Sequence, residues 1–136
     1  SNDFIPFRAG IQAGANAVLV SHNIVECMDA GTPASLSPKV HSLLREELGF
    51  DGVIMTDDLH MDAIQKYTKD STAAVMAVKA GNDMLCCTDF TTEIPAVLAA
   101  VKKGEIPENQ IDQSVLRILK MKQELGLLEP VPASDR

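Results

Sequence analysis

The stretch Gly49-Phe-Asp-Gly-Val-Ile-Met-Thr-Asp57 decides the fold, because its pattern occurs three times in this chain of 136 residues. The other copies are Gly14-Ala-Asn-Ala-Val-Leu-Val-Ser-His22 and Gly81-Asn-Asp-Met-Leu-Cys-Cys-Thr-Asp89. In each copy a glycine is followed by Asn or Asp, then by a short apolar run and a hydroxyl residue. A polar residue ends each copy: His22, Asp57 or Asp89. The spacing of about 30 to 35 residues indicates one structural unit that is used three times.

Each part of the repeat has a physical meaning. Glycine ends a helix in the left-handed conformation, and the Asn or Asp makes the turn that follows. A continuous apolar run is typical of a parallel strand that is buried on both faces. The last polar residue then falls at the carboxyl end of the strand. In a βα-barrel the site lies at this end of the strands, so His22, Asp57 and Asp89 are predicted to share one rim.

Amphipathic segments separate the predicted strands. Ser37 and Pro38 are typical of a helix N-cap and of the first helical position. Helices are predicted at 7–13, 37–48, 73–80, 93–103 and 109–125, with a further one after Asp58. Alternating strands and helices predict an α/β protein with a parallel sheet. The pattern allows a βα-barrel or a doubly wound sheet, and the absence of a GxGxxG or P-loop motif argues against nucleotide binding.

Composition narrows the possible functions. The net charge is −7, which argues against a nucleic-acid partner, because such partners require a basic face. No apolar stretch reaches the roughly 20 residues that span a bilayer. Cys27, Cys86 and Cys87 form neither a disulfide framework nor a metal motif, so they are interpreted as small core residues. No metal site is expected, and the Pro-containing tail 130–136 is expected to be loose.

The segment 44–59, Leu-Arg-Glu-Glu-Leu-Gly-Phe-Asp-Gly-Val-Ile-Met-Thr-Asp-Asp-Leu, is very similar to the nucleophile segment of family 3 glycoside hydrolases, close to their β-N-acetylhexosaminidase branch. Other stretches resemble that branch in the same order: 4–11 (Phe-Ile-Pro-Phe-Arg-Ala-Gly-Ile), 18–22 (Val-Leu-Val-Ser-His), 33–37 (Pro-Ala-Ser-Leu-Ser) and 80–85 (Ala-Gly-Asn-Asp-Met-Leu). The likeness extends from Asp3 to about Leu128. Several linked motifs in one order are more specific than any single motif.

The resemblance implies a fold and a set of site residues. The fold would be the second half of a (β/α)8 barrel, with about three βα units and a C-terminal helix over residues 1–129. Asp57 would be the catalytic nucleophile of a retaining glycosidase, and would form a covalent glycosyl-enzyme. His22, Asp58 and Met61 would contact the substrate, although Asp58 is also interpreted as a helix cap. Asp89 receives no role from the family, and no metal or organic cofactor is expected.

The resemblance also implies a substrate and a missing partner. Terminal β-linked N-acetylglucosamine from peptidoglycan-derived saccharides is the expected substrate. A β-glucosidase or β-xylosidase, transfer to phosphate, and a non-catalytic binding module remain alternatives. The family's "KHFPGHG" segment and Asp-x-His acid/base loop do not occur in the sequence. The chain is therefore expected to be an incomplete barrel with little turnover, and to self-associate or to pair with an N-terminal half-barrel. The sequence leaves the compartment open.

Overall fold

A computed structural model describes residues 2–68, 72–87 and 89–128 of the chain. Its elements, in chain order, are η1 (Asn2–Phe4), α1 (Ile5–Gln12), β1 (Ala17–Val20), η2 (Ala34–Leu36), α2 (Pro38–Ser42), η3 (Leu43–Glu47), β2 (Val53–Asp58), α3 (Asp62–Gln65), α4 (Ala73–Ala80), β3 (Met84–Cys86), α5 (Phe90–Lys102) and α6 (Glu108–Glu124). The predicted tail 130–136 lies outside the described residues.

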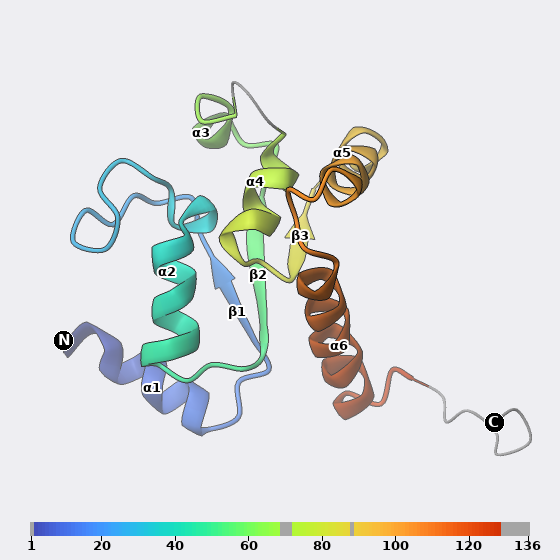
Figure 1. Cartoon of the computed structure of the whole chain (residues 1–136). Coiled ribbons are helices and arrows are strands. Elements are labelled where there is room, and N and C mark those ends of the chain that lie inside the picture. The colour runs from blue at the N-terminus through green and yellow to red at the C-terminus, as the bar shows by residue number, and fades with distance from the viewer. Residues whose placement is uncertain (1, 69–71, 88, 129–136) are drawn as a thin grey trace, which may run out of the picture.

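The strands form one parallel sheet in the order β1-β2-β3 (Figure 1). This arrangement confirms the predicted α/β architecture with three parallel strands. The centre of the sheet is β2, whose Val53 and Ile54 are fully buried. Because all three strands run the same way, their carboxyl ends meet at one edge of the sheet.

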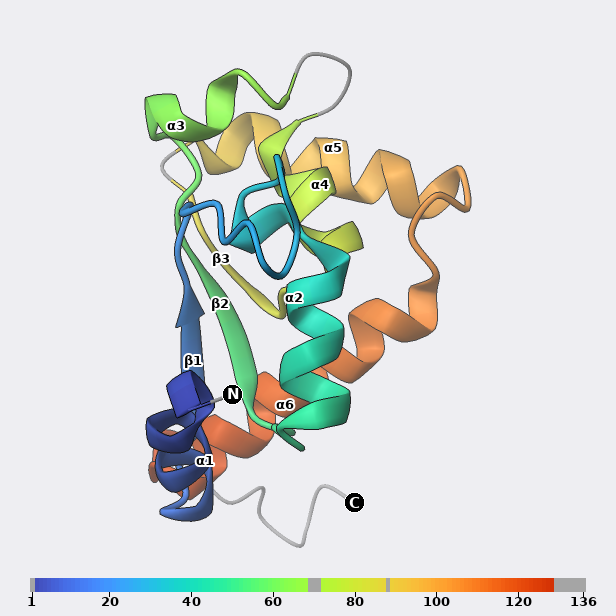
Figure 2. The same cartoon turned by 90° about the vertical axis from the view of Figure 1, so that its left-hand side faces the viewer.

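Helices cover only one face of this sheet. Figure 2 shows α2 and α4 packed on that face, while no helix of the described chain lies over the opposite face. On the uncovered face, which we call the open face, Leu19 lies beside Met55 and Met55 beside Met84. Leu19 is 55% exposed, which is unusual for a leucine at the middle of a strand. The open face is therefore an apolar surface that the described chain leaves in contact with solvent.

Local sequence signals explain where the helices begin and end. The hydroxyl of Ser37 accepts a hydrogen bond from the backbone N–H of Val40 at 3.3 Å, and Pro38 occupies the first position of α2. Thr72 caps α4 in the same way. Helix α4 ends at Gly81, whose φ of 114° is a left-handed conformation that side chains disfavour. Ser37 and Pro38 confirm the predicted start of α2, and Gly81 confirms the predicted end of α4.

A buried ion network joins the amino ends of the strands to α6. The Asp83 side chain is 1% exposed and forms ion pairs with Arg45 and Arg117. One carboxylate oxygen of Asp83 also accepts the backbone N–H of Ile54 at 2.9 Å, and the other accepts the hydroxyl of Ser114 at 2.7 Å. Burial lowers the pKa of Arg45 from its ordinary value, while the Asp83 carboxylate opposes this shift. The network therefore fixes β2 against β3 and α6 at the end of the sheet remote from the predicted rim.

Two expectations from the sequence are wrong. Asp58 does not cap the next helix, because the chain continues beyond it and Met61 is the N-cap residue of α3. The cysteines are not core residues: Cys27 and Cys86 are exposed, and Cys87 is partly exposed. Cys86 is exposed because β3 is short and lies at the edge of the sheet. Within the described ranges, no helix is long and apolar enough to cross a membrane.

Candidate active site

Asp57 lies at the carboxyl end of β2, the central strand. Its side chain is partly buried, and one carboxylate oxygen accepts the backbone N–H of Asp58 at 2.9 Å. Among the described residues, the second oxygen makes no hydrogen bond. The register between β2 and β3 shifts between Met55 and Asp58, so Asp57 lies within an irregularity of the strand, a feature that often occurs next to active sites. The backbone thus holds one oxygen of the Asp57 carboxylate, while the other remains available to a ligand.

The peptide that follows Asp58 is held from both sides. Its carbonyl oxygen lies 2.8 Å from the Nε2 atom of His22, at the end of β1. Its N–H belongs to Leu59 and donates to the carbonyl of Cys86, at the end of β3, at 2.9 Å. The carboxylate of Asp58 accepts the backbone N–H of His60 at 2.9 Å. Residues from all three strand ends therefore meet at the segment that carries Asp57.

The structure brings His22 to the backbone carbonyl of Asp58, next to Asp57, whereas the repeat predicted a common rim for His22, Asp57 and Asp89. The Nδ1 atom of His22 lies 2.7 Å from the hydroxyl oxygen of Ser35. Both ring nitrogens of His22 thus have partners within the protein. The expected contact of His22 with substrate remains a prediction. The two contacts show that groups within the protein also hold the ring in place.

Sequence reasoning missed two buried polar residues that support His22, namely Ser35 and Asn82. Ser35 and Asn82 are 0% and 2% exposed. The side-chain amide of Asn82 donates to the carbonyl of Ser35 at 2.8 Å and to that of Ala77 at 2.8 Å. Ser35 belongs to the Pro-Ala-Ser-Leu-Ser stretch and Asn82 follows a helix-ending glycine. The available signal was a small polar residue inside an otherwise apolar segment. This signal does not indicate which groups such a residue binds.

Met61 and Asp89 lie near this rim but make other contacts. Met61 is 45% exposed and its backbone N–H donates to the carbonyl of Asp58 at 3.3 Å. Asp89 occupies the N-cap position of α5, and the hydrogen bond from the Thr91 hydroxyl holds the pKa of Asp89 below its usual value. Asp89 and His60 both line a hollow of about 400 Å³ above α4. Asp89 is thus the N-cap residue of α5, but its side chain makes no capping hydrogen bond to the helix. The role of Met61 stays a prediction.

The loop after β1 is tied to the start of α2. Asp29 accepts hydrogen bonds from the hydroxyl of Ser37 at 2.6 Å and from the ammonium group of Lys39 at 3.0 Å. The Ser37 bond is the main reason why the pKa of Asp29 lies below its ordinary value. Because this loop leads into Ser35, these bonds help to fix the residue that contacts His22.

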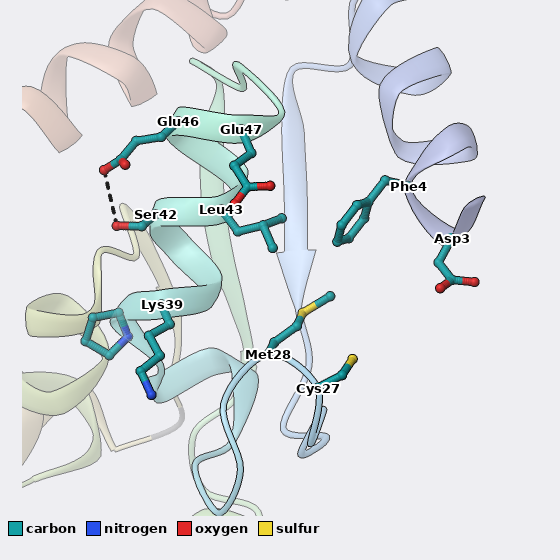
Figure 3. A pocket seen from close by; sticks show the side chains of 10 residues that line it. Asp3, Phe4, Cys27, Met28, Lys39, Ser42, Leu43, Glu46 and Glu47 are labelled. Carbon is teal, nitrogen blue, oxygen red and sulfur yellow. Dashed lines mark hydrogen bonds between the residues drawn. The ribbon is translucent and has the colours of Figure 1, made fainter. Parts of the chain in front are cut away.

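A further hollow lies away from these residues. It measures about 910 Å³ and lies between the start of the chain and the outer side of α2. Figure 3 shows that Phe4, Met28 and Leu43 point into it, with Glu46 and Glu47 at one end. Asp57 and its neighbours do not line this hollow. We therefore place the candidate site at the carboxyl ends of the strands, where three strands contribute to one cluster.

The chemistry that this cluster offers is that of the Asp57 carboxylate. Among the residues that the structure describes, no three His, Cys, Asp or Glu side chains are grouped as metal ligands. A carboxylate at the carboxyl edge of a parallel sheet, with one oxygen free, is instead typical of α/β enzymes that use an acidic side chain. Residues 1–121 match the family model described as the glycosyl hydrolase family 3 N terminal domain, and the chain therefore belongs to this family.

Similar proteins agree with this assignment and with the β-N-acetylhexosaminidase branch. The chain is 35% identical over 131 residues to the β-hexosaminidase LpqI of Mycobacterium tuberculosis, covering 89% of this chain and 34% of that protein. It matches the structure of a family 3 β-N-acetylglucosaminidase from Paenibacillus sp. with a TM-score of 0.82 and 38% identity, covering 94% of this chain and 26% of that one. It is also 33% identical over 135 residues to a periplasmic β-glucosidase of Salmonella typhimurium, covering 93% of this chain and 16% of that protein. The chain thus spans about a third of the curated β-hexosaminidase, and less of the other two proteins.

Proposed function

We propose that residues 1–129 are the second half of a (β/α)8 barrel. The open face supports this proposal, because in a barrel the face without helices points to the interior and is covered by the other strands. In the described part of the chain, the outer edges of β1 and β3 pair with no strand. The chain also spans only 26% of the similar Paenibacillus enzyme. The remaining strands of such a barrel would pair with these edges and cover Leu19 and Met55.

The 136-residue chain by itself is expected to self-associate through the open face, because exposed apolar residues and unpaired edges favour association. Leu19→Glu places a charge on this face and should shift the chain toward the monomer in sedimentation velocity. Leu116→Glu is the matched control, since Leu116 is 65% exposed on α6, and should leave the association unchanged. A monomeric wild-type chain at high concentration would count against the proposal, as would equal effects of both variants.

The function that the site supports best is retaining hydrolysis of terminal β-linked N-acetylglucosamine, with peptidoglycan-derived saccharides as the substrate class. The available oxygen of Asp57 is the observation that carries this proposal. In the first step this oxygen attacks the anomeric carbon and the bond to the leaving oxygen breaks. A proton donor must protonate the leaving oxygen, and in this proposal the other half of the barrel supplies it. Water then hydrolyses the glycosyl ester and restores the Asp57 carboxylate.

Asp58 and Met61 are proposed to contact the sugar beside Asp57. The Asp58 carboxylate is partly buried and directed to the loop that begins at His60. Met61 presents an exposed apolar side chain in the same loop, which suits the apolar face of a sugar ring. The names of the mycobacterial and Paenibacillus relatives favour N-acetylglucosamine as that sugar. The Salmonella β-glucosidase keeps a glucoside substrate as the second candidate.

Two measurements on the complete barrel test this function. An activated fluorosugar that forms a slowly hydrolysed ester should label Asp57, and peptide mass spectrometry should locate the label. The p-nitrophenyl N-acetylglucosaminide should be cleaved in preference to the corresponding glucoside. Reversible sugar binding without a covalent label would instead identify a non-catalytic module. Release from the glucoside alone would select the β-glucosidase alternative.

A further inference from the structure

The peptide between Asp58 and Leu59 is the best-fixed part of the candidate site. The end of β1 holds its carbonyl through His22, at 2.8 Å, and the N–H of Met61 donates to the same carbonyl at the longer distance of 3.3 Å. The end of β3 holds its N–H through the carbonyl of Cys86, at 2.9 Å. The N–H that contacts the Asp57 carboxylate belongs to Asp58, one peptide earlier. A rotation of the held peptide would therefore move the group that orients Asp57.

His22 is itself held by a chain of buried contacts. Its Nδ1 atom meets the hydroxyl of Ser35, whose backbone N–H donates to the carbonyl of Ser21 at 3.1 Å. Asn82, at the end of α4, donates to the carbonyl of Ser35. Ser35 and Asn82 are almost fully buried, so their positions are set by packing. The contacts thus run without a break from the core to the end of β2.

These contacts determine which ring nitrogen of His22 carries the proton. The Asp58 carbonyl can only accept a hydrogen bond, so Nε2 must carry the hydrogen and donate it. In the neutral ring Nδ1 is then an acceptor, and the Ser35 hydroxyl can donate to it. Both ring nitrogens are satisfied in this tautomer, and neither is left for a sugar hydroxyl.

We propose that His22 is a positioning residue for the reaction of Asp57. This inference rests on the proposed function, in which the free oxygen of Asp57 attacks a sugar. His22 fixes the Asp58–Leu59 peptide, and through it the backbone N–H of Asp58 that holds the other oxygen. Loss of this contact lets the carboxylate turn away from the line of attack. It should therefore slow the chemical step and leave the binding of the sugar largely unchanged.

The test compares His22→Leu and His22→Gln in the complete barrel. The leucine variant removes both hydrogen bonds, and its kcat should fall roughly 100-fold, with KM within about 3-fold of wild type. The glutamine variant keeps an N–H that can reach the Asp58 carbonyl, so it should recover most of the rate. Amide hydrogen exchange at Asp58 and Leu59 should be faster in the leucine variant than in wild type.

His41 provides the matched control. It is also a buried histidine, but its Nδ1 atom contacts the carbonyl of Ser37, the N-cap residue of α2. His41→Leu should leave kcat and the exchange at Asp58 unchanged. If His22→Leu does not fold, Ser35→Ala decides the question: it removes the Nδ1 partner and should lower kcat about 5- to 10-fold without raising KM.

Other outcomes overturn the proposal. A rise in KM at constant kcat would make His22 a substrate contact, and equal losses in the leucine and glutamine variants would exclude the role of the donated hydrogen bond. An unchanged rate in Ser35→Ala would exclude the role proposed for the Nδ1 contact that holds the ring. Failure of the proposed function is distinguishable, because Asp57→Asn would then keep its full rate. Amide exchange at Asp58 and Leu59 would still report on the contact of His22.

Discussion

Asp57→Asn is expected to abolish hydrolysis by the complete barrel, with a loss in kcat of about 10⁴-fold or more. The amide retains the size of the carboxylate and can still accept the backbone N–H of Asp58, so the fold should be preserved. It lacks the negative charge and the nucleophilic oxygen that the covalent step requires. Steady-state rates with a p-nitrophenyl substrate measure this effect, and circular dichroism verifies the fold.

A smaller substitution separates nucleophilic attack from other roles of the same carboxylate. Asp57→Gly leaves space at the site, and added azide should restore glycosyl transfer from an activated substrate by attacking the anomeric carbon itself. The product should be a glycosyl azide of inverted configuration, which NMR can identify. Asp62→Asn is the control, since Asp62 is an exposed acidic residue in the first turn of α3. An Asp57→Asn enzyme with the wild-type rate would remove Asp57 from the mechanism.

Asp83→Asn is expected to cause the largest loss of stability, about 3 to 5 kcal/mol in the free energy of unfolding. The carboxylate is 1% exposed and accepts hydrogen bonds from the Arg45 and Arg117 guanidinium groups. The amide removes the charge that faces both partly buried guanidinium groups. Arg117 keeps only its ion pair with the exposed Asp51, at 3.5 Å. The amide also replaces one of the two acceptor oxygens of Asp83 by an NH₂ group, which cannot accept a hydrogen bond. Urea unfolding of wild type and variant gives the difference.

An exposed ion pair provides the comparison for Asp83. Lys79 and Glu105 are 3.6 Å apart, with side chains 48% and 45% exposed. Glu105→Gln should change the free energy of unfolding by less than about 1 kcal/mol, because solvent screens such a pair. A similar cost for both variants would show that burial does not determine the strength of the Asp83 network.

The site and the network occupy opposite ends of the same strands. Asp83 fixes β2 and β3 at their amino ends, while His22 and Cys86 hold the segment at the carboxyl end of β2. The Asp83 variant should therefore reduce stability more than the rate of the remaining folded enzyme. The Asp57 variant should do the reverse. This separation follows from the general division of βα-barrels into a catalytic rim and a stabilising base.

The sequence by itself determined the elements of the fold and the strand-end position of Asp57. Glycines with left-handed backbones end the helices, Ser37 caps α2, and continuous apolar runs form the three parallel strands. These signals are local, since each depends on the backbone preference or the burial of a few adjacent residues. For this reason the sequence alone could predict that the repeat forms a parallel strand with Asp57 at its carboxyl end.

Only the tertiary structure decided which side chains act together. His22 meets the carbonyl of Asp58 across 36 residues of sequence, and Arg45 meets Asp83 across 38. Such pairs depend on how strands and helices pack, and a hydrogen bond between distant residues leaves no local signal in the sequence. The same reason explains the two errors. Packing determines that α3 begins only after Met61, beyond Asp58, and that the edge strand of Cys86 is left exposed.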